Sequence, residues 1–520
     1  MTLNSHTQTP PRASFDHAFV AVSAAVFLAL CVLFWPFVAD DAYIVGRYAM
    51  NAADGNGLVY NIGERVSALT SPLHALLETL FAFAGFDPVD SYRVIAPLFV
   101  LAGWLIAVRR TGLRGPALVF FTAMSLFSPF VVLWTVGGLE TAMLVFLATV
   151  FVSRLVVLCR TGVALSRDFI WLGLLVALMF LTRYDSLFVT APILLAILAV
   201  EFRRAALWYG AAVCFMVAAS WLGFAALYYG DVFPTSYYVK FALGGRPPID
   251  SLSALLNFTL VSGLVFVVFL VRPAPMATRT PLSRAILRGG AIGAIIFLLY
   301  ASRASGQHMM FGYRLFVPYL MGAALIITVS LGHPRVSIAG LAVLWQAVMV
   351  AVVAFIGVNP APLTRLPVLG QAYAEYELIT PAAYGAFMDI LEADAAAITD
   401  DWHSRGLDGQ PSIYLRTGGT GYWLPDFYVY EMLISYRQDC PDEPFRNVAA
   451  SNYMQQLDFR QSASLVVEWG RIRPDIADDA GLMFATTLEW YGPQVIGYLL
   501  GASPRALTLS PQVTGCSTTP

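Results

Sequence analysis

The sequence predicts a polytopic α-helical membrane protein that carries a C-terminal α/β domain outside the cytoplasm. Only 12% of its 520 residues are charged and 58% are hydrophobic, with a mean hydropathy of +0.68. A soluble globular protein carries about 25% charged residues. The 11 Trp, 24 Tyr and 35 Phe residues suit the aromatic belts of a membrane protein. This composition excludes an ordinary cytosolic enzyme, a disordered regulator and a nucleic-acid-binding protein.

Charge divides the chain into two domains. Residues 1–357 contain 22 Lys and Arg residues against 14 Asp and Glu residues, whereas residues 358–520 contain 9 against 19. The long apolar runs end at the same boundary, and the acidic remainder is large enough to form its own core. We therefore expect a transmembrane domain at 1–357 and a soluble domain at 358–520.

Uncharged apolar runs predict about eleven membrane-spanning helices, since a span needs about 20 apolar residues and packed helices tolerate fewer. In chain order, the runs are 18–39, 94–108, 115–139, 141–153, 169–182, 186–200, 205–230, 251–271, 289–302, 315–334 and 336–364. The first run is longer than the apolar core of a cleaved signal peptide, so we interpret it as a retained signal anchor.

The basic residues predict which way the helices cross the membrane. With a cytoplasmic N-terminus, the inner loops collect 14 basic and 3 acidic residues and the outer loops 8 basic and 11 acidic, which is the positive-inside arrangement. Segment 72–84 is short and contains His74 and Glu78, so we interpret it as an amphipathic helix at the outer interface. Residues 40–90 then form the first external loop. We expect a multi-pass protein of a bacterial cytoplasmic membrane with a periplasmic C-terminal domain.

Two adjacent carboxylates, Asp40 and Asp41, follow the first apolar run. Mutual repulsion and the lowered dielectric of a membrane surface raise the pKa of at least one member of such a pair, and a raised pKa suits a general base near neutral pH. The alternative is that Asp41 caps the helix that follows. Both are candidate catalytic residues.

Three cations in the other outer loops are candidates to bind the phosphate of a lipid-linked donor, because cations stabilise a phosphate leaving group. They are Arg183, Lys240 and Arg314. A surface ion pair is the alternative for Arg183, and snorkelling to the interface is the alternative for Arg314. The candidate substrate-binding residues are Tyr43, Arg47, Glu140, Asp185, Tyr237 and His308. The sequence contains no recognised metal-binding or nucleotide-binding motif, and we expect no cofactor.

The segment DDAYIVGRYAMNAADGNGLVYNIGERVSALTSPLHALL, which begins at Asp40, closely resembles the first external loop of GT-C superfamily membrane glycosyltransferases. The nearest resemblance is to the polyprenyl-phosphate-sugar-dependent enzymes that include the mycobacterial terminal arabinofuranosyltransferases. The blocks GGLETAM, LTRYDSLFV, YYGDVFPTSYYVKFAL and MFGYRLFVPYL are similar to later blocks of that family and occur in the same order.

This resemblance implies a GT-C-like enzyme that moves a sugar, with arabinofuranose as a candidate, from a polyprenyl phosphate donor to an extracytoplasmic glycan acceptor with inversion. The family uses an acidic residue of this loop as catalytic base, here Asp40 or Asp41. A transporter or flippase of lipid-linked sugar is an alternative, but such proteins tend to contain internal repeats and none is found. A non-enzymatic envelope or motility assembly factor is another. The expected partners are the lipid donor, the glycan acceptor and membrane lipid.

The C-terminal domain is expected to mix helix and strand. The sequence pattern predicts an amphipathic helix at 381–400 and strands at 411–416 and 463–468. The Gly-rich turn at 418–421 is weak evidence for phosphate binding. Cys440 and Cys516 can pair in an oxidising compartment, and the closed loop would stabilise the domain by roughly 4 kcal/mol on the chain-entropy model. Two free thiols are the alternative.

Overall fold

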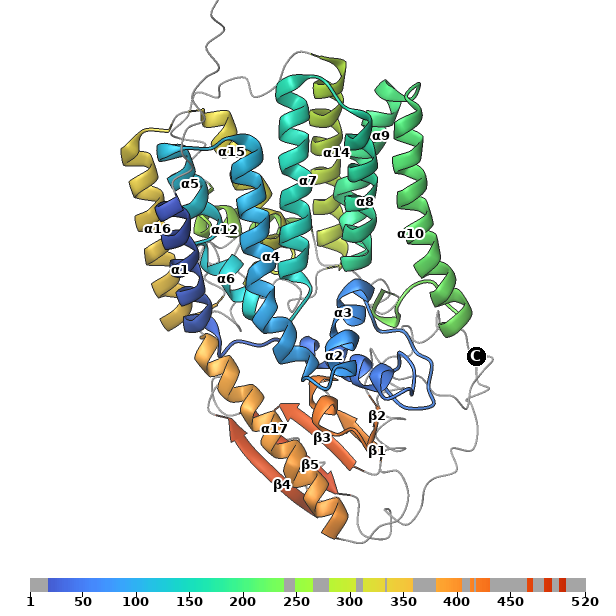
Figure 1. The fold of residues 1–520 in the computed structure, drawn as a ribbon. Helices are drawn as coiled ribbons and strands as arrows, with labels where there is room; N and C mark the ends of the chain where they lie inside the picture. The colour runs from blue at the N-terminus through green and yellow to red at the C-terminus, as the bar shows by residue number, and fades with distance from the viewer. Residues whose placement is uncertain are drawn as a thin grey trace, which may run out of the picture.

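The computed structural model describes residues 17–237, 248–264, 280–304, 312–332, 334–358, 380–404, 412–415, 418–430, 465–470, 481–488 and 495–501. In these residues the chain forms a helical bundle with a smaller part, built from helix and strand, at one end (Figure 1). Lys240, His308, Cys440 and Cys516 lie outside the described residues. The roles expected of these four residues therefore stay predictions.

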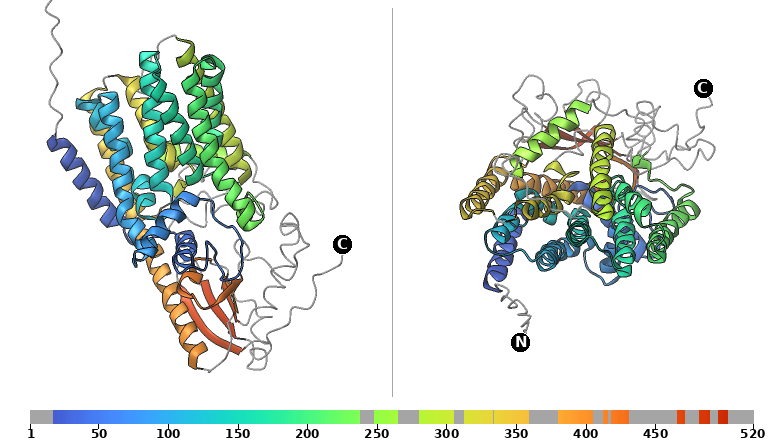
Figure 2. Two further views of the ribbon diagram at one scale, coloured as in Figure 1. Left: turned by 45° about the vertical axis from the view of Figure 1, so that its right-hand side comes forward. Right: turned by 90° about the horizontal axis from the view of Figure 1, so that it is seen from above.

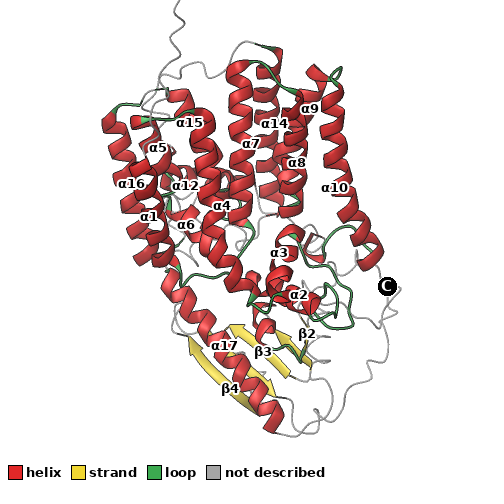
Figure 3. Cartoon of the chain, viewed as in Figure 1, coloured by secondary structure: helices red, strands yellow, loops and turns green. Residues whose placement is uncertain are grey.

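Apolar helices standing side by side form the bundle (Figure 3). They are α1 (His17–Phe34), α4 (Pro88–Thr111), α5 (Gly115–Ser125), α6 (Pro129–Val136), α7 (Thr141–Thr161), α8 (Ser166–Thr182), α9 (Ser186–Glu201), α10 (Ala205–Tyr229), α12 (Pro248–Val261), α14 (Pro281–Ala304), α15 (Val317–Leu331) and α16 (Val336–Phe355). Each predicted apolar run overlaps one of these helices, and the run 115–139 contains both α5 and α6. The predicted α-helical class of the membrane part is confirmed.

Six helices of the described chain are long and apolar enough to cross a membrane alone: α1, α4, α7, α10, α14 and α16. Helices α5 and α6 meet at a bend of 51° and add a seventh span if the pair counts as one. Helices α9 and α15 are shorter, with 16 and 15 residues. The count of eleven spans and their orientation therefore stay predictions.

Helices α8 and α10 approach each other through glycine. A Cβ atom on Gly173 would lie 2.0 Å from the carbonyl oxygen of Gly210, and one on Gly210 would lie 2.2 Å from the carbonyl oxygen of Phe169. Backbones this close leave no room for a side chain, which is the small-residue packing common between membrane helices.

Helices α2 (Asp40–Ala53) and α3 (Pro72–Phe83) lie across one end of the bundle, within the predicted first external loop (Figure 1). The polar face of α3 points inward, where His74 and Glu78 are fully buried with Nε2 and Oε1 3.2 Å apart. Its apolar side chains Leu80 and Phe83 are 67% and 76% exposed. This inverted pattern suits the predicted amphipathic helix that lies against lipid.

The C-terminal part consists of α17 (Pro381–Ser404), β1 (Ser412–Leu415), the 3₁₀ turn η3 (Gly418–Trp423), β2 (Tyr428–Tyr430), β3 (Leu465–Gly470), β4 (Gly481–Leu488) and β5 (Val495–Gly501). The sheet order is β2-β1-β3-β5-β4, with β1 parallel to β2 and β3, and β5 antiparallel to β3 and β4. Helix α17 lies beside this sheet (Figure 2). Helix α17 and strands β1 and β3 overlap the predicted helix and strands, while the C-terminal domain and its boundary stay predictions.

A core of buried residues joins α2 to this C-terminal part. Tyr48 of α2 belongs to the same apolar cluster as Trp402 of α17 and Phe427, which follows η3. Segments more than 350 residues apart in the chain are thus packed together around the first external loop. The contact places C-terminal residues next to the start of α2.

Candidate active site

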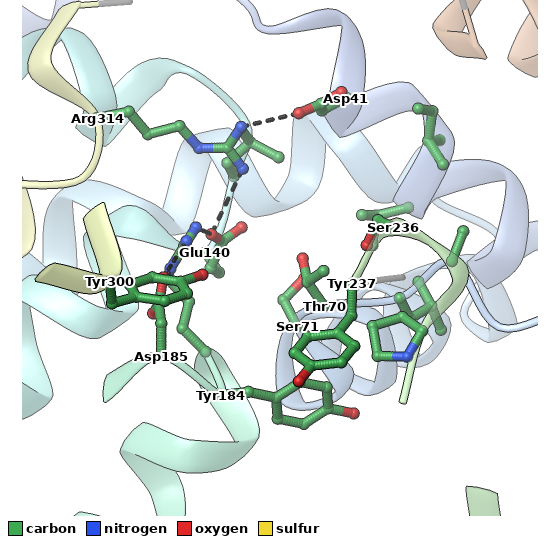
Figure 4. Close-up of a pocket in the computed structure, with 17 residues that line it drawn as sticks. Asp41, Thr70, Ser71, Glu140, Tyr184, Asp185, Ser236, Tyr237, Tyr300 and Arg314 are labelled. Carbon is green, nitrogen blue, oxygen red and sulfur yellow. Dashed lines mark hydrogen bonds and ion pairs between the residues drawn. The ribbon is translucent and has the colours of Figure 1, made fainter. Parts of the chain in front are cut away.

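A cavity of about 140 Å³ lies where α2 and α3 meet the end of the bundle (Figure 4). Its walls come from the first external loop, the segments just before α7 and α15, the break between α8 and α9, the segment after α10, and α14. The lining residues are Asp41, Ile44, Val45, Ala68, Leu69, Thr70, Ser71, Leu139, Glu140, Arg183, Tyr184, Asp185, Pro234, Ser236, Tyr237, Tyr300 and Arg314. Six of the predicted site residues thus share one cavity.

Five charged side chains of this lining form a continuous series of ion pairs, which we call the charge ladder. Oδ2 of Asp41 is 2.8 Å from Nη1 of Arg314, and Nη2 of Arg314 is 3.6 Å from Oε1 of Glu140. Nη1 of Arg183 donates to the same Glu140 oxygen at 2.7 Å. Nε and Nη2 of Arg183 donate to the two oxygens of Asp185 at 3.0 and 2.6 Å. Three carboxylates therefore face two guanidinium groups.

Exposure differs sharply along the charge ladder. The side chain of Glu140 is 1% exposed and that of Arg314 is 11% exposed, whereas the Asp41 side chain is 50% exposed. Asp41 is therefore the carboxylate of the ladder that a substrate in the cavity reaches most easily. Within the described residues, no group of three or more His, Cys, Asp or Glu side chains is arranged to hold a metal ion.

Breaks between helices place the inner members of the ladder. Glu140 directly precedes α7 and follows Gly138, whose φ of +77° is readily adopted only by glycine. Arg183 and Asp185 occupy the short break between α8 and α9. In a continuous helix, successive side chains point in different directions around the axis. The breaks before α7 and between α8 and α9 instead allow Glu140, Arg183 and Asp185 to meet at the same end of the bundle.

A strained turn before α15 places Arg314. Its neighbour Tyr313 has a φ of +56°, which is uncommon for a residue with a bulky side chain. The Tyr313 ring is fully buried and packs edge-on against Phe130 at a centroid distance of 5.3 Å. Nε1 of Trp134 donates to the carbonyl oxygen of Gly312 at 2.8 Å. These contacts hold the turn in a conformation that directs Arg314 toward Asp41.

The two guanidinium groups determine the ionisation of Glu140. Burial by itself would raise the pKa of this carboxyl, but the charges of Arg314 and Arg183 outweigh burial and lower the pKa to about 2. Glu140 is therefore ionised throughout the physiological pH range, and a carboxylate with so low a pKa is a poor general base.

Asp40 and Asp41 are adjacent but have different surroundings. Asp41 lines the cavity, whereas the Asp40 backbone packs against Gly419 of η3. Burial, followed by the charge of Asp41, raises the pKa of Asp40 to about 7. The raised pKa that the sequence predicts for this pair is found at Asp40, and access to the cavity is found at Asp41. Neither aspartate caps α2 through its side chain, because Ala39 occupies the cap position.

Tyr184 and Tyr237 lie across the cavity from Arg314 (Figure 4). The Tyr237 ring stacks on Phe233 with centroids 4.8 Å apart, and Nε1 of Trp221 donates to the Tyr184 hydroxyl at 2.5 Å. This wall also presents hydroxyl groups. Five polar residues of the lining are not among the predicted site residues: Thr70, Ser71, Tyr184, Ser236 and Tyr300. Tyr184 had a signal, since it lies between two predicted site residues, but Tyr300 looks like any interfacial tyrosine.

Arg47 and Tyr43 do not line the cavity, although the sequence predicts that they bind substrate. Arg47 is 2% exposed. Its guanidinium donates to the backbone carbonyl oxygens of Tyr60, Gly421, Leu424 and Phe427. Tyr43 packs on Trp423 with ring centroids 4.3 Å apart. Both side chains join α2 to the C-terminal part, and their predicted role in substrate binding stays a prediction.

Comparison with solved structures identifies the fold. Two crystal structures of ArnT from Cupriavidus metallidurans are similar to this chain, one bound to undecaprenyl phosphate (14% identity, TM-score 0.56) and one in the apo state (13% identity, TM-score 0.57). Each comparison covers 93% of this chain and 98% of the other. The chain has the fold of ArnT. The likeness confirms a polytopic fold of this kind, and the GT-C assignment itself stays a prediction.

Comparisons by sequence add nothing to this result. No protein-family model matches the chain, and no curated protein matches it. At 13 to 14% identity, the likeness to ArnT extends to the fold alone.

Proposed function

We propose that this protein is a GT-C membrane glycosyltransferase that transfers a sugar from a polyprenyl phosphate to a hydroxyl group of a glycan acceptor, with Asp41 as general base. The observation that carries the proposal is the half-exposed Asp41 carboxylate beside Arg314 in a cavity of the described chain. The fold supports the donor class, because the ArnT structure with the same fold holds undecaprenyl phosphate. Such a transfer needs a base for the acceptor hydroxyl and a cation for the leaving phosphate.

The proposed reaction uses the two sides of the cavity. The acceptor oxygen attacks the anomeric carbon and its proton passes to Asp41, while the bond from that carbon to the phosphate oxygen breaks. The polyprenyl phosphate leaves with the bonding electrons, and the configuration at the anomeric carbon inverts. Tyr184 and Tyr237 offer flat faces that suit the C–H faces of a sugar ring.

The two described arginines have different capacity for a phosphate. Arg183 is already compensated by two carboxylates, Glu140 and Asp185. Arg314 contacts Asp41 directly and Glu140 only at 3.6 Å, and its Nε is buried without a hydrogen-bond partner among the described residues. We therefore assign phosphate binding to Arg314, together with the predicted Lys240, and give Arg183 a structural role in holding Glu140.

The finer features of the proposal come from the resemblance of the first external loop. They are arabinofuranose as a candidate sugar, an acceptor on the periplasmic side, and a location in the bacterial cytoplasmic membrane with a cytoplasmic N-terminus. The positive-inside distribution of basic residues supports this orientation.

The test is sugar transfer by the purified full-length protein in lipid nanodiscs. A panel of polyprenyl-phosphate sugars that includes arabinofuranose is incubated with a glycan acceptor, and products are read by mass spectrometry. Transfer from at least one donor is expected. Asp41→Asn should lower the rate about 10²- to 10⁴-fold, the usual contribution of a general base, and Asp90→Asn, whose carboxylate is 63% exposed outside the cavity, should not.

Two results would overturn the proposal. A folded Asp41→Asn protein that transfers sugar at the wild-type rate would remove Asp41 as the base, and Asp40→Asn would then be the variant to examine. The second result comes from protein reconstituted in liposomes. Translocation of the lipid-linked sugar across the liposome bilayer, without any sugar transfer, would favour the flippase alternative.

A further inference from the structure

The Gly-rich turn η3 has no part in the cavity, yet it is packed tightly against the first turn of α2. A Cβ atom added to Gly419 would lie 2.5 Å from the carbonyl oxygen of Asp40 and 3.2 Å from its Cα. The backbone of Gly419 does not adopt a positive φ. Glycine is therefore required here by the closeness of Asp40 and not by the conformation of the turn.

The turn is held on α2 from both sides. Nη1 of Arg47 donates to the carbonyl oxygens of Gly421 and Leu424, the latter at 3.0 Å. The hydroxyl of Tyr422 donates to Oδ2 of Asp87 at 2.5 Å, and Asp87 belongs to the first external loop. Because these bonds prevent the turn from moving away, an enlarged residue at 419 has to displace the Asp40 backbone instead.

Displacement at Asp40 reaches the proposed base directly. The amide of Asp41 donates to Oδ1 of Asp40 at 2.9 Å, and the Asp41 carboxylate is 2.8 Å from Arg314. The two residues share a peptide bond, so a shift of the Asp40 carbonyl turns the plane that carries the Asp41 backbone. A misplacement of about 1 Å in a catalytic group can cost about 100-fold in rate.

We propose that the turn Gly418–Trp423 positions Asp41 for catalysis, so that the C-terminal segment is a working part of the active site. Gly419 is a positioning residue that acts through the Asp40 backbone. This inference rests on the proposed glycosyltransferase activity. It assigns the C-terminal segment a role in kcat, in place of the phosphate binding for which its glycines were weak evidence.

The test compares Gly419→Ala with Gly289→Ala in the transfer assay. Gly289 is a matched control. Its added Cβ would lie 2.8 Å from the carbonyl oxygen of Pro192, at the contact between α14 and α9, and neither residue lines the cavity. Both variants should lose thermal stability. Only Gly419→Ala should lose kcat, by about 10- to 100-fold, with the KM for the donor lipid changed less than about 3-fold, because Arg314 is untouched.

A second variant covers the case in which Gly419→Ala does not fold. Tyr422→Phe removes only the hydroxyl bond to Asp87, and we expect it to lower kcat by about 3- to 10-fold at unchanged donor KM, because the turn is held less firmly. A wild-type kcat in a folded Gly419→Ala or, failing that, in Tyr422→Phe overturns the inference. An equal fall in kcat for Gly289→Ala does the same.

The experiment separates this inference from the proposed function. Active wild-type protein and inactive Asp41→Asn, combined with a wild-type kcat for Gly419→Ala, would reject the positioning role and leave the enzyme. Absence of transfer by the wild-type protein would reject both.

Discussion

Glu140 gives the sharpest test of the charge ladder, because its carboxylate contacts both arginines of the cavity. Glu140→Gln keeps the shape of the side chain and removes its charge. Arg183 and Arg314 would then have only one charged carboxylate each among the described residues, Asp185 and Asp41 respectively. The variant therefore isolates the electrostatic contribution of the ladder with little change in packing.

The structure gives the size of the effect. Lowering the pKa of Glu140 from 4.5 to about 2 corresponds to about 3 kcal/mol of stability at neutral pH. A second, independent measure agrees: removing one partner of a buried ion pair lowers the free energy of unfolding by about 3–5 kcal/mol. We therefore expect Glu140→Gln to lower the free energy of unfolding by about 3 kcal/mol at pH 7.

The pH dependence has a defined sign. Because the pKa of Glu140 is lower in the folded protein than in the unfolded chain, its stabilising contribution is complete above about pH 4.5 and is lost as the pH falls toward 2. The difference between wild-type and variant should therefore shrink between pH 7 and pH 3. Denaturant titration of both proteins in detergent, at pH 7 and at pH 3, measures this difference in the free energy of unfolding.

Glu201→Gln is the matched control. Glu201 pairs with Arg204 at 2.6 Å, and the Arg204 side chain is 47% exposed, so the loss should stay below about 1 kcal/mol. If Glu140→Gln were no more destabilising than Glu201→Gln at pH 7, or equally destabilising at pH 7 and pH 3, the account of the ladder would be refuted.

The remaining predictions concern stability at other positions. Asp40→Asn should stabilise the protein more at pH 8 than at pH 4. The pKa of Asp40 is about 7 in the folded protein against the ordinary 3.8, so ionisation of this carboxyl opposes folding as the pH rises. The gain in the free energy of unfolding is at most about 4 kcal/mol, and a gain that does not change with pH in unfolding titrations would contradict the prediction. Arg47→Lys should cost about 3 kcal/mol or more, since one ammonium cannot reach carbonyl groups that a planar guanidinium binds together; a melting temperature equal to wild type would count against this. Gly173→Ala should lower the melting temperature through the α8–α10 contact, whereas Gly223→Ala, whose added Cβ meets nothing within 4 Å, should not; equal effects would disprove the glycine contact.

Local signals in the sequence predicted much of the fold and part of the site. Apolar runs predict helices because lipid offers no hydrogen-bond partners, so the backbone N–H and C=O groups of each run have to bond to one another. Polar residues at the ends of such runs are costly in a membrane, so Glu140, Arg183 and Asp185 stood out. The structure brings these three together with Asp41 and Arg314, although no spacing in the sequence relates them.

The sequence could not show which arginine serves the cavity and which serves the fold. Arg47 lies in the segment with the most specific resemblance and was expected at the substrate, but its partner carbonyl at Gly421 lies 374 residues away in the chain. Arg183 and Asp185 were expected as a pair, but the second carboxylate on Arg183, from Glu140, depends on how α7 and α8 pack. Partners of this kind are set by tertiary structure alone.

The same reasoning explains why Asp40 and Asp41 cannot be ranked by sequence. Adjacent residues on a helix differ in direction by about 100°, so one can face a cavity while the other faces a neighbouring segment. Here Asp41 faces Arg314 and lines the cavity, whereas the Asp40 backbone packs against Gly419 of η3 and Asp40 is not among the lining residues. The residue that lines the cavity and the residue that packs against the C-terminal turn are thus direct neighbours. This arrangement makes the packing of the C-terminal turn against Asp40 a condition for the placement of Asp41.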